Sequence, residues 1–219
     1  MMEKTFLKKI LLAVASCFFI ALSLASCTSE INLELKKDGT VDVIFNGSAG
    51  KAFSAMIRSA AGLSTDASSS VIFDTKDIEY EMSGNGFSNV KAVTKTGTDL
   101  SVTMTDKNRK SALFSSGVVK AENGKLSAVL TPEKLVDFYS KADSQTVQFM
   151  DMLLAPVFND EKMSEEEYLE VLASFYGEEI AREIRDADFR ITLKNPDGTK
   201  LTQTIKITKL LTLDEVVRF

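Results

Sequence analysis

The sequence lacks histidine and tryptophan and contains only three prolines and two cysteines. Without histidine, the Ser-His-Asp and Cys-His nucleophile systems and the histidine-based zinc sites are excluded. The side chain that normally titrates near neutral pH is missing as well. An enzyme built on this chain could use only carboxylate, lysine, tyrosine or Ser-Lys chemistry, and the lack of tryptophan weakens an interpretation as a sugar-stacking protein.

Basic residues are fewer than acidic ones, 26 against 31, which gives a net charge of −5. This balance argues against a nucleic-acid partner and against a broad basic face for anionic lipids. The apolar share of 44% is ample for a core, and the length suits one domain.

The first 26 residues have the three parts of a secretory leader. Lys4, Lys8 and Lys9 form a positive segment, residues 10–22 are apolar, and residues 23–26 form a run of mostly small residues. The apolar stretch is shorter than the ~20 residues that a spanning helix needs. We therefore predict a signal peptide at residues 1–26 rather than a retained membrane helix.

The leader ends in the lipobox Leu24-Ala25-Ser26-Cys27. This motif predicts cleavage between Ser26 and Cys27 and lipidation of Cys27. Residues 1–27 resemble the type II signal peptides of bacterial lipoproteins, which implies a diacylglycerol on the Cys27 sulfur and an acyl chain such as palmitate on its new amine. Two or more chains make membrane attachment stable.

The expected location is the bacterial cell envelope, on the periplasmic or outer-membrane face, with the membrane as partner through Cys27. Because Cys17 would leave with the leader and Cys27 would be acylated, the mature chain should contain no free thiol and no disulfide. Residues 27–30 are expected to form a short lipidated tether, followed by the folded part, residues 31–219.

Four segments with alternating polarity predict β-hairpins. In the first, a two-residue loop would set Leu35 opposite Asp42, whereas a three-residue loop at residues 37–39 sets Leu35 opposite Val41. The second arrangement keeps the apolar faces together, so we predict it, with Gly39 in the left-handed conformation.

The other three hairpins follow from their turn residues. Pro196-Asp197-Gly198 would pair Leu193 with Leu201 and Phe189 with Ile205. Asn123-Gly124 is a type I′ signal that would pair Ala121 with Leu126 and Val119 with Ala128. The fourth hairpin joins residues 88–95 to residues 99–105 near Gly97.

Helices are expected between the hairpins, at residues 51–63, 74–82, 131–154 and 164–185. Thr131 and Pro132 suit the N-cap and first position of the third helix. Ser164 and Glu167 form a capping box at the start of the fourth, which should break or bend at Gly177.

Together these elements predict an α+β fold with a mostly antiparallel sheet of about eight short strands, packed with three to four helices. The first and last hairpins bracket the rest, which favours one domain whose ends meet in one sheet. Residues 131–185 are a candidate helical subdomain.

The segment FMDMLLAPVF is apolar almost all round and has two interpretations. It is either plain core or a lining for an acyl chain or a partner's apolar face. The candidate surface residues are Phe149, Met150, Met152, Leu153, Val157 and Phe158.

No motif in the sequence indicates a reaction or a bound cofactor. Residues 47–52 suggest a phosphate loop, but Ala52 stands where Ser or Thr should hold magnesium. The glutamates of residues 165–167 and 178–183 lack the spacing of a calcium loop and suit a solvated helix face. We therefore expect no metal, no cofactor and no catalytic site, although a carboxylate-based hydrolase stays open as a less favoured alternative.

The segments LELKKDGTVDVIFNGSAG and GFSNVKAVTKTGTDLSVTMTD resemble LppM-like bacterial membrane lipoproteins. The resemblance implies an envelope domain with an α/β fold that contacts lipid headgroups or glycolipids. The favoured function is thus a non-catalytic binding module for lipid or another hydrophobic ligand. The alternative is a structural or assembly lipoprotein that docks on another envelope protein through its 131–185 helices.

Overall fold

The computed structural model describes residues 28–60, 73–141 and 162–219. Nine strands and seven helices lie in these residues. The hairpins and helices alternate along the chain, and the predicted α+β class is confirmed.

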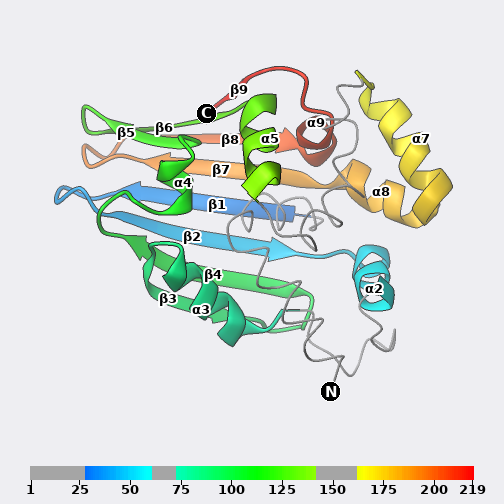
Figure 1. The fold of residues 1–219 in the computed structure, drawn as a ribbon, viewed down its shortest axis with the longest axis horizontal. Coiled ribbons are helices and arrows are strands. Elements are labelled where there is room, and N and C mark those ends of the chain that lie inside the picture. The colour runs from blue at the N-terminus through cyan, green and yellow to red at the C-terminus, as the bar shows by residue number, and fades with distance from the viewer. Residues whose placement is uncertain (1–27, 61–72, 142–161) are drawn as a thin grey trace.

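The larger sheet has six strands in the order β3-β4-β2-β1-β7-β8 (Figure 1). All neighbouring strands are antiparallel except β1 and β7, which run parallel. The strands are β1 (Thr28–Leu35), β2 (Val41–Ser48), β3 (Ser88–Val93), β4 (Asp99–Asp106), β7 (Asp188–Lys194) and β8 (Lys200–Lys206).

The register of the first hairpin is confirmed, with Leu35 opposite Val41. Gly39 has a φ of 85°, the left-handed conformation that the three-residue loop requires. The loop is closed by the Asp38 carboxylate, which accepts from the hydroxyl of Thr40 at 2.7 Å and from its N–H at 3.0 Å. These two bonds, the hydroxyl's first, hold the pKa of Asp38 below its ordinary value.

The other three hairpins are confirmed as well. Leu193 pairs with Leu201 in the last hairpin, and Ala121 pairs with Leu126 across the Asn123-Gly124 turn. Asn123 and Gly124 both have positive φ, as a type I′ turn requires. The fourth hairpin joins β3 to β4 through a turn that contains Gly97.

The parallel pairing of β1 with β7 joins the first and last hairpins in one sheet. It also corrects the predicted tether. Residues 28–30 belong to β1, because they pair with residues 46–48 of β2 on one side and residues 188–190 of β7 on the other. A strand bonded on both sides satisfies the backbone groups that a free tether would leave to water.

A second sheet of three strands, in the order β5-β6-β9, replaces the single sheet that the sequence predicted. It comprises β5 (Val119–Glu122), β6 (Lys125–Leu130) and β9 (Val217–Arg218), and β9 was not predicted. Leu126 and Ala128 of β6 are buried in the core of the large sheet. The third hairpin therefore covers that sheet's apolar face instead of extending its edge.

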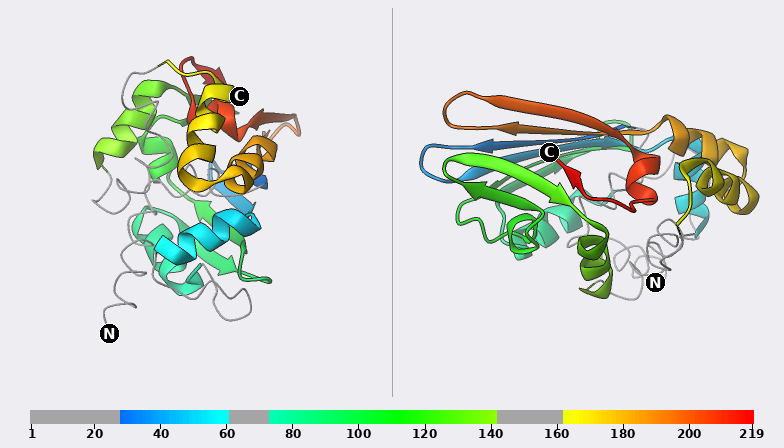
Figure 2. Two further views of the ribbon diagram at one scale, coloured as in Figure 1. Left: turned by 90° about the vertical axis from the view of Figure 1, so that its right-hand side faces the viewer. Right: turned by 90° about the horizontal axis from the view of Figure 1, so that it is seen from above.

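One face of the six-stranded sheet is covered and the other is open. The second sheet, α3 and α5 lie on the same side of the large sheet, and no described element covers its opposite side (Figure 2). Alternate residues of β1, β2 and β4, such as Leu33, Val43 and Val102, are buried on the covered side. They pack with Ile78 and Met82 of α3 in one core.

The helices are α2 (Lys51–Ala60), α3 (Thr75–Gly84), α4 (Ala112–Ser115), α5 (Pro132–Lys141), α7 (Glu165–Tyr176), α8 (Glu178–Asp186) and α9 (Ile207–Leu211). The capping box of Ser164 and Glu167 and the break at Gly177 are confirmed. The hydroxyl of Thr131 accepts from the N–H of Lys134, as its predicted capping role requires. The short helices α4 and α9 were not predicted, and the expected part of α5 beyond Lys141 lies outside the described residues.

A second cluster of buried residues packs α2, α7, α8 and α9 together at one end of the large sheet (Figure 1). Tyr168 of α7 is fully enclosed there, and burial, with a smaller contribution from Tyr176, raises the pKa of its phenol well above the ordinary value. Within the described ranges, no helix is long and apolar enough to span a membrane.

Candidate functional site

The open face of the six-stranded sheet is polar. Residues that alternate with the buried ones carry carboxylates, ammonium groups, amides and hydroxyls on every strand, and Ile44 and Val93 are also exposed there. The side chains form rows that cross the strands, because residues in register stand side by side on one face. Two regions of this face, at opposite ends of the strands, contain clustered charges.

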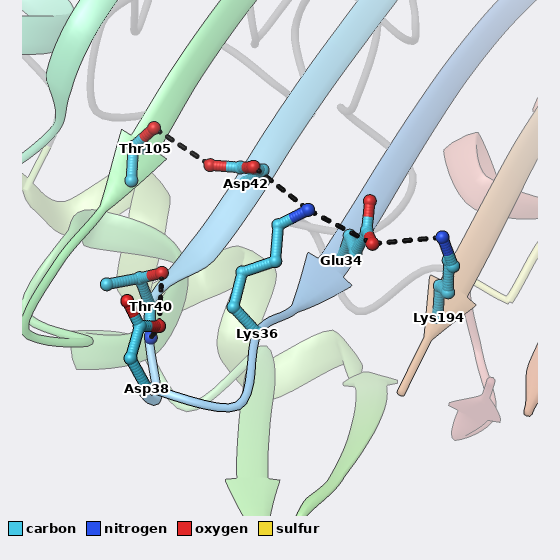
Figure 3. A network of polar contacts seen from close by, with 7 residues as sticks. All are labelled: Glu34, Lys36, Asp38, Thr40, Asp42, Thr105 and Lys194. Carbon is cyan, nitrogen blue, oxygen red and sulfur yellow. Dashed lines mark hydrogen bonds and ion pairs between the residues drawn. The ribbon is translucent and has the colours of Figure 1, made fainter. Parts of the chain in front are cut away.

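At the hairpin end of β1, four charged side chains form one network (Figure 3). Glu34 contacts Lys194 at 2.9 Å and Lys36 at 3.0 Å, and Lys36 reaches Asp42 at 3.3 Å. The hydroxyl of Thr105 donates to Asp42 at 2.9 Å. Two carboxylates and two ammonium groups cancel one another, so this network links strands rather than attracting a charged ligand.

The network alters the titration of its central groups. Hydrogen bonds from Lys194 and then Lys36 lower the pKa of Glu34. The bond to Glu34 is the main cause that raises the pKa of Lys36. The side chains of Glu34, Lys36 and Lys194 each keep more than a third of their surface exposed to water. Their ion pairs therefore add little to the free energy of unfolding.

At the opposite end of the same strands lies an open cleft of about 390 Å³. Its floor consists of two rows that cross the sheet. One row runs Asn46, Glu30, Arg190, Thr204, and the other runs Ser48, Thr28, Asp188. Ser29 and Gly47 complete the lining.

Every lining residue except Gly47 has a polar or charged side chain, and these side chains supply carboxylates, a guanidinium, hydroxyls and an amide but no aromatic ring. Asp188 is paired with Lys206 at 3.0 Å, and Asn46 accepts a hydrogen bond from Ser101 at 2.8 Å. Such a surface can bind a small polar or charged ligand by hydrogen bonds and ion pairs, whereas an acyl chain would find no apolar wall here.

None of the site residues predicted from the sequence lies in the part of the chain that the structure describes. Ser26, Cys27 and the apolar segment with Phe149, Met150, Met152, Leu153, Val157 and Phe158 are outside the described residues. The cleft was missed because its residues come from three separate stretches of sequence, 28–30, 46–48 and 188–204. Only the pairing of β1 with β7 brings them together, and the polar positions of each strand were the one available signal.

The rejected phosphate loop at residues 47–52 is confirmed as a plain strand-to-helix turn. The Glu183 carboxylate of α8 accepts from the N–H groups of Ala52 and Phe53, both at 2.9 Å. These are the groups that would have to bind a phosphate at the start of α2.

Three of the glutamates of α7 and α8 have structural roles. Glu167 completes the capping box, Glu165 accepts a hydrogen bond from Thr208, and Glu183 caps α2. In the part of the chain that the structure describes, no three acidic, histidine or cysteine side chains are grouped so as to hold a metal ion.

No protein-family model, curated protein or solved structure matches this chain. The cleft and the network of Figure 3 are therefore interpreted from their own geometry. The network is internally neutralised, while the cleft retains unpaired polar groups, so the cleft is the candidate site in the described residues.

Proposed function

We propose that this chain is a lipid-anchored, non-catalytic protein of the bacterial envelope that binds a lipid or another hydrophobic ligand at the membrane surface. The observation that supports the membrane anchor in this proposal is the start of β1 at Thr28, the residue after Cys27 of the lipobox. An acylated Cys27 would be bonded directly to a strand of the folded part, with no linker between them.

The position of β1 makes this attachment rigid. β1 lies between β2 and β7, so its first residue is paired with a neighbouring strand on both sides. Consecutive Cα atoms are about 3.8 Å apart, so the end of the sheet that carries Thr28 would stay close to the lipid headgroups. The same end carries α2 and α8, which adjoin Ser48 and Asp188, the register partners of Thr28.

A labelling experiment tests the anchor. The full chain, produced in bacteria fed an alkyne-bearing fatty acid, should acquire the label and stay in the membrane fraction after a high-salt wash. Cys27→Ala should lose the label and accumulate as the uncleaved precursor. Cys17→Ala is the matched control and should behave as the wild type, and label retained on Cys27→Ala would refute the anchor.

Native mass spectrometry of the mature protein, extracted in a mild detergent, tests the ligand. We expect a co-purifying mass in the lipid range that is lost in the Met152→Glu, Leu153→Glu double variant. An apo protein that also binds no lipid in titrations would refute lipid binding.

A second function, docking on another envelope protein, is favoured by one feature of α7. Val171 and Phe175 are 39% and 76% exposed, and they lie one helical turn apart on the same face. An apolar face of a partner would bury these two side chains together. The apo outcome of the mass-spectrometry experiment would favour this function over lipid binding.

A further inference from the structure

The cleft contains two opposite charges that face each other without forming a pair. Glu30 of β1 and Arg190 of β7 are register partners on neighbouring strands, which lie about 4.8 Å apart. Glu30 is instead turned along its own strand, where one oxygen accepts from the Asn32 amide at 2.9 Å. Within the described part of the chain, the Arg190 guanidinium has no ion pair and no hydrogen bond.

The other charged group of the lining is already neutralised. Asp188 is paired with Lys206 at 3.0 Å at the rim. Among the described residues, the lining groups without a partner therefore include one guanidinium, the second oxygen of Glu30, the amide nitrogen of Asn46 and the hydroxyls of Thr28, Ser48 and Thr204. A ligand that satisfies them must carry an anion and a cation only a few atoms apart.

The anion is better matched by a carboxylate than by a phosphate. A single guanidinium binds a carboxylate through two parallel hydrogen bonds. Phosphate sites usually add free backbone N–H groups from a helix start or a glycine-rich loop. Here β1, β2 and β7 are each paired on both sides, and the first N–H groups of α2 are held by Glu183.

Size and polarity limit the ligand further. A volume of about 390 Å³ lies in the range of small-molecule sites and exceeds what a single small amino acid fills. The lining has no aromatic ring for a sugar or a base to stack on. The ligand should therefore be small, strongly polar and unable to gain much from apolar burial.

We propose that this cleft binds a zwitterion of the amino-acid type, either a free amino acid or a short peptide. Its carboxylate pairs with Arg190, its ammonium group pairs with Glu30, and the hydroxyls of the rim bind its remaining polar atoms. The proposal uses none of the residues 149–158 on which the proposed lipid binding depends, so the two proposals can fail separately.

Calorimetric titration of the mature protein, purified in a non-ionic detergent, tests this site with alanine and dialanine as probes. Arg190→Gln should weaken binding about tenfold or more, because it removes a charge-assisted hydrogen bond. Glu30→Gln should weaken the zwitterions but leave N-acetylalanine, which lacks the ammonium group, unaffected. Lys194→Gln, four residues along the same face of β7 and outside the cleft, is the control and should bind as the wild type.

The comparison of probes decides the outcome. Tighter binding of dialanine than of alanine identifies a peptide, and the reverse order a free amino acid. Binding of phosphoethanolamine in place of both would overturn the carboxylate assignment. Absence of binding, or equal weakening by Lys194→Gln, would overturn the site, even if the mass spectra still show a bound lipid.

Discussion

Glu34 is the residue on which the network of Figure 3 depends, because it accepts from both Lys194 and Lys36. Its pKa is lower in the folded protein than the ordinary value of 4.5. A carboxylate of this kind stabilises the fold above its unfolded pKa, and the contribution is lost as the pH falls through the lower, folded pKa. The two carboxylates of the network balance its two ammonium groups only while Glu34 is ionised.

We predict that Glu34→Gln lowers the free energy of unfolding at pH 7 by less than about 1 kcal/mol, because the groups are half exposed. The difference from the wild type should disappear once the pH falls below the lowered, folded pKa of Glu34, where the native carboxylate is protonated too. Urea unfolding over a series of pH values from 7 into acid measures it. Glu122→Gln is the control, since Glu122 is exposed on β5. If the free energy of unfolding of Glu34→Gln stayed below that of the wild type by the same amount in acid, the prediction would be contradicted.

At the scale of elements, α2 depends on a residue 130 positions away for its N-cap. The Glu183 carboxylate of α8 occupies the N–H groups of Ala52 and Phe53, and α2 has no acidic residue in its own first turn. This contact fixes α2 to α8 at the end of the sheet that carries Thr28.

Glu183→Ala should therefore cost about 1–2 kcal/mol of stability, the usual loss when an N-cap is removed. Glu179→Ala, on the same helix, removes only an exposed contact of 3.9 Å with Arg182 and should change stability by less than about 0.5 kcal/mol. Thermal unfolding of the two variants provides the comparison. Equal losses would mean that the cap contributes nothing beyond general helix stability.

At the scale of the whole molecule, the large sheet connects the first hairpin to the last. Leu33 is 1% exposed in β1, and its register partners are Val43 of β2 and Leu193 of β7. Leu201 of β8 lies at the sheet edge and is 49% exposed. Removal of the Leu33 side chain should therefore destabilise both hairpins at once.

We predict that Leu33→Ala costs about 2–5 kcal/mol, whereas Leu201→Ala costs less than about 1 kcal/mol. Chemical denaturation of either variant should show one transition in both circular dichroism and tyrosine fluorescence. Two separated transitions would instead mean that the 131–185 helices unfold independently of the sheet.

The amino-acid sequence by itself determined the local structure of this protein. The registers of three hairpins, the capping box at Ser164 and the break at Gly177 were all predictable, because alternation of polarity and turn chemistry act over a few residues. The fourth hairpin was predicted without its register, which is irregular between Ser88 and Lys91. The α+β class followed from the order of these elements. The polar character of one sheet face was also present in the alternation of each strand.

Tertiary structure alone decided how these pieces combine. The parallel pairing of β1 with β7, the separation of β5, β6 and β9 into a second sheet, and the cap of α2 by Glu183 join residues far apart in the chain. No local signal specifies such contacts, since they depend on which apolar faces can be buried together. The cleft is their result, because Glu30 and Arg190 become neighbours only through the β1–β7 pairing.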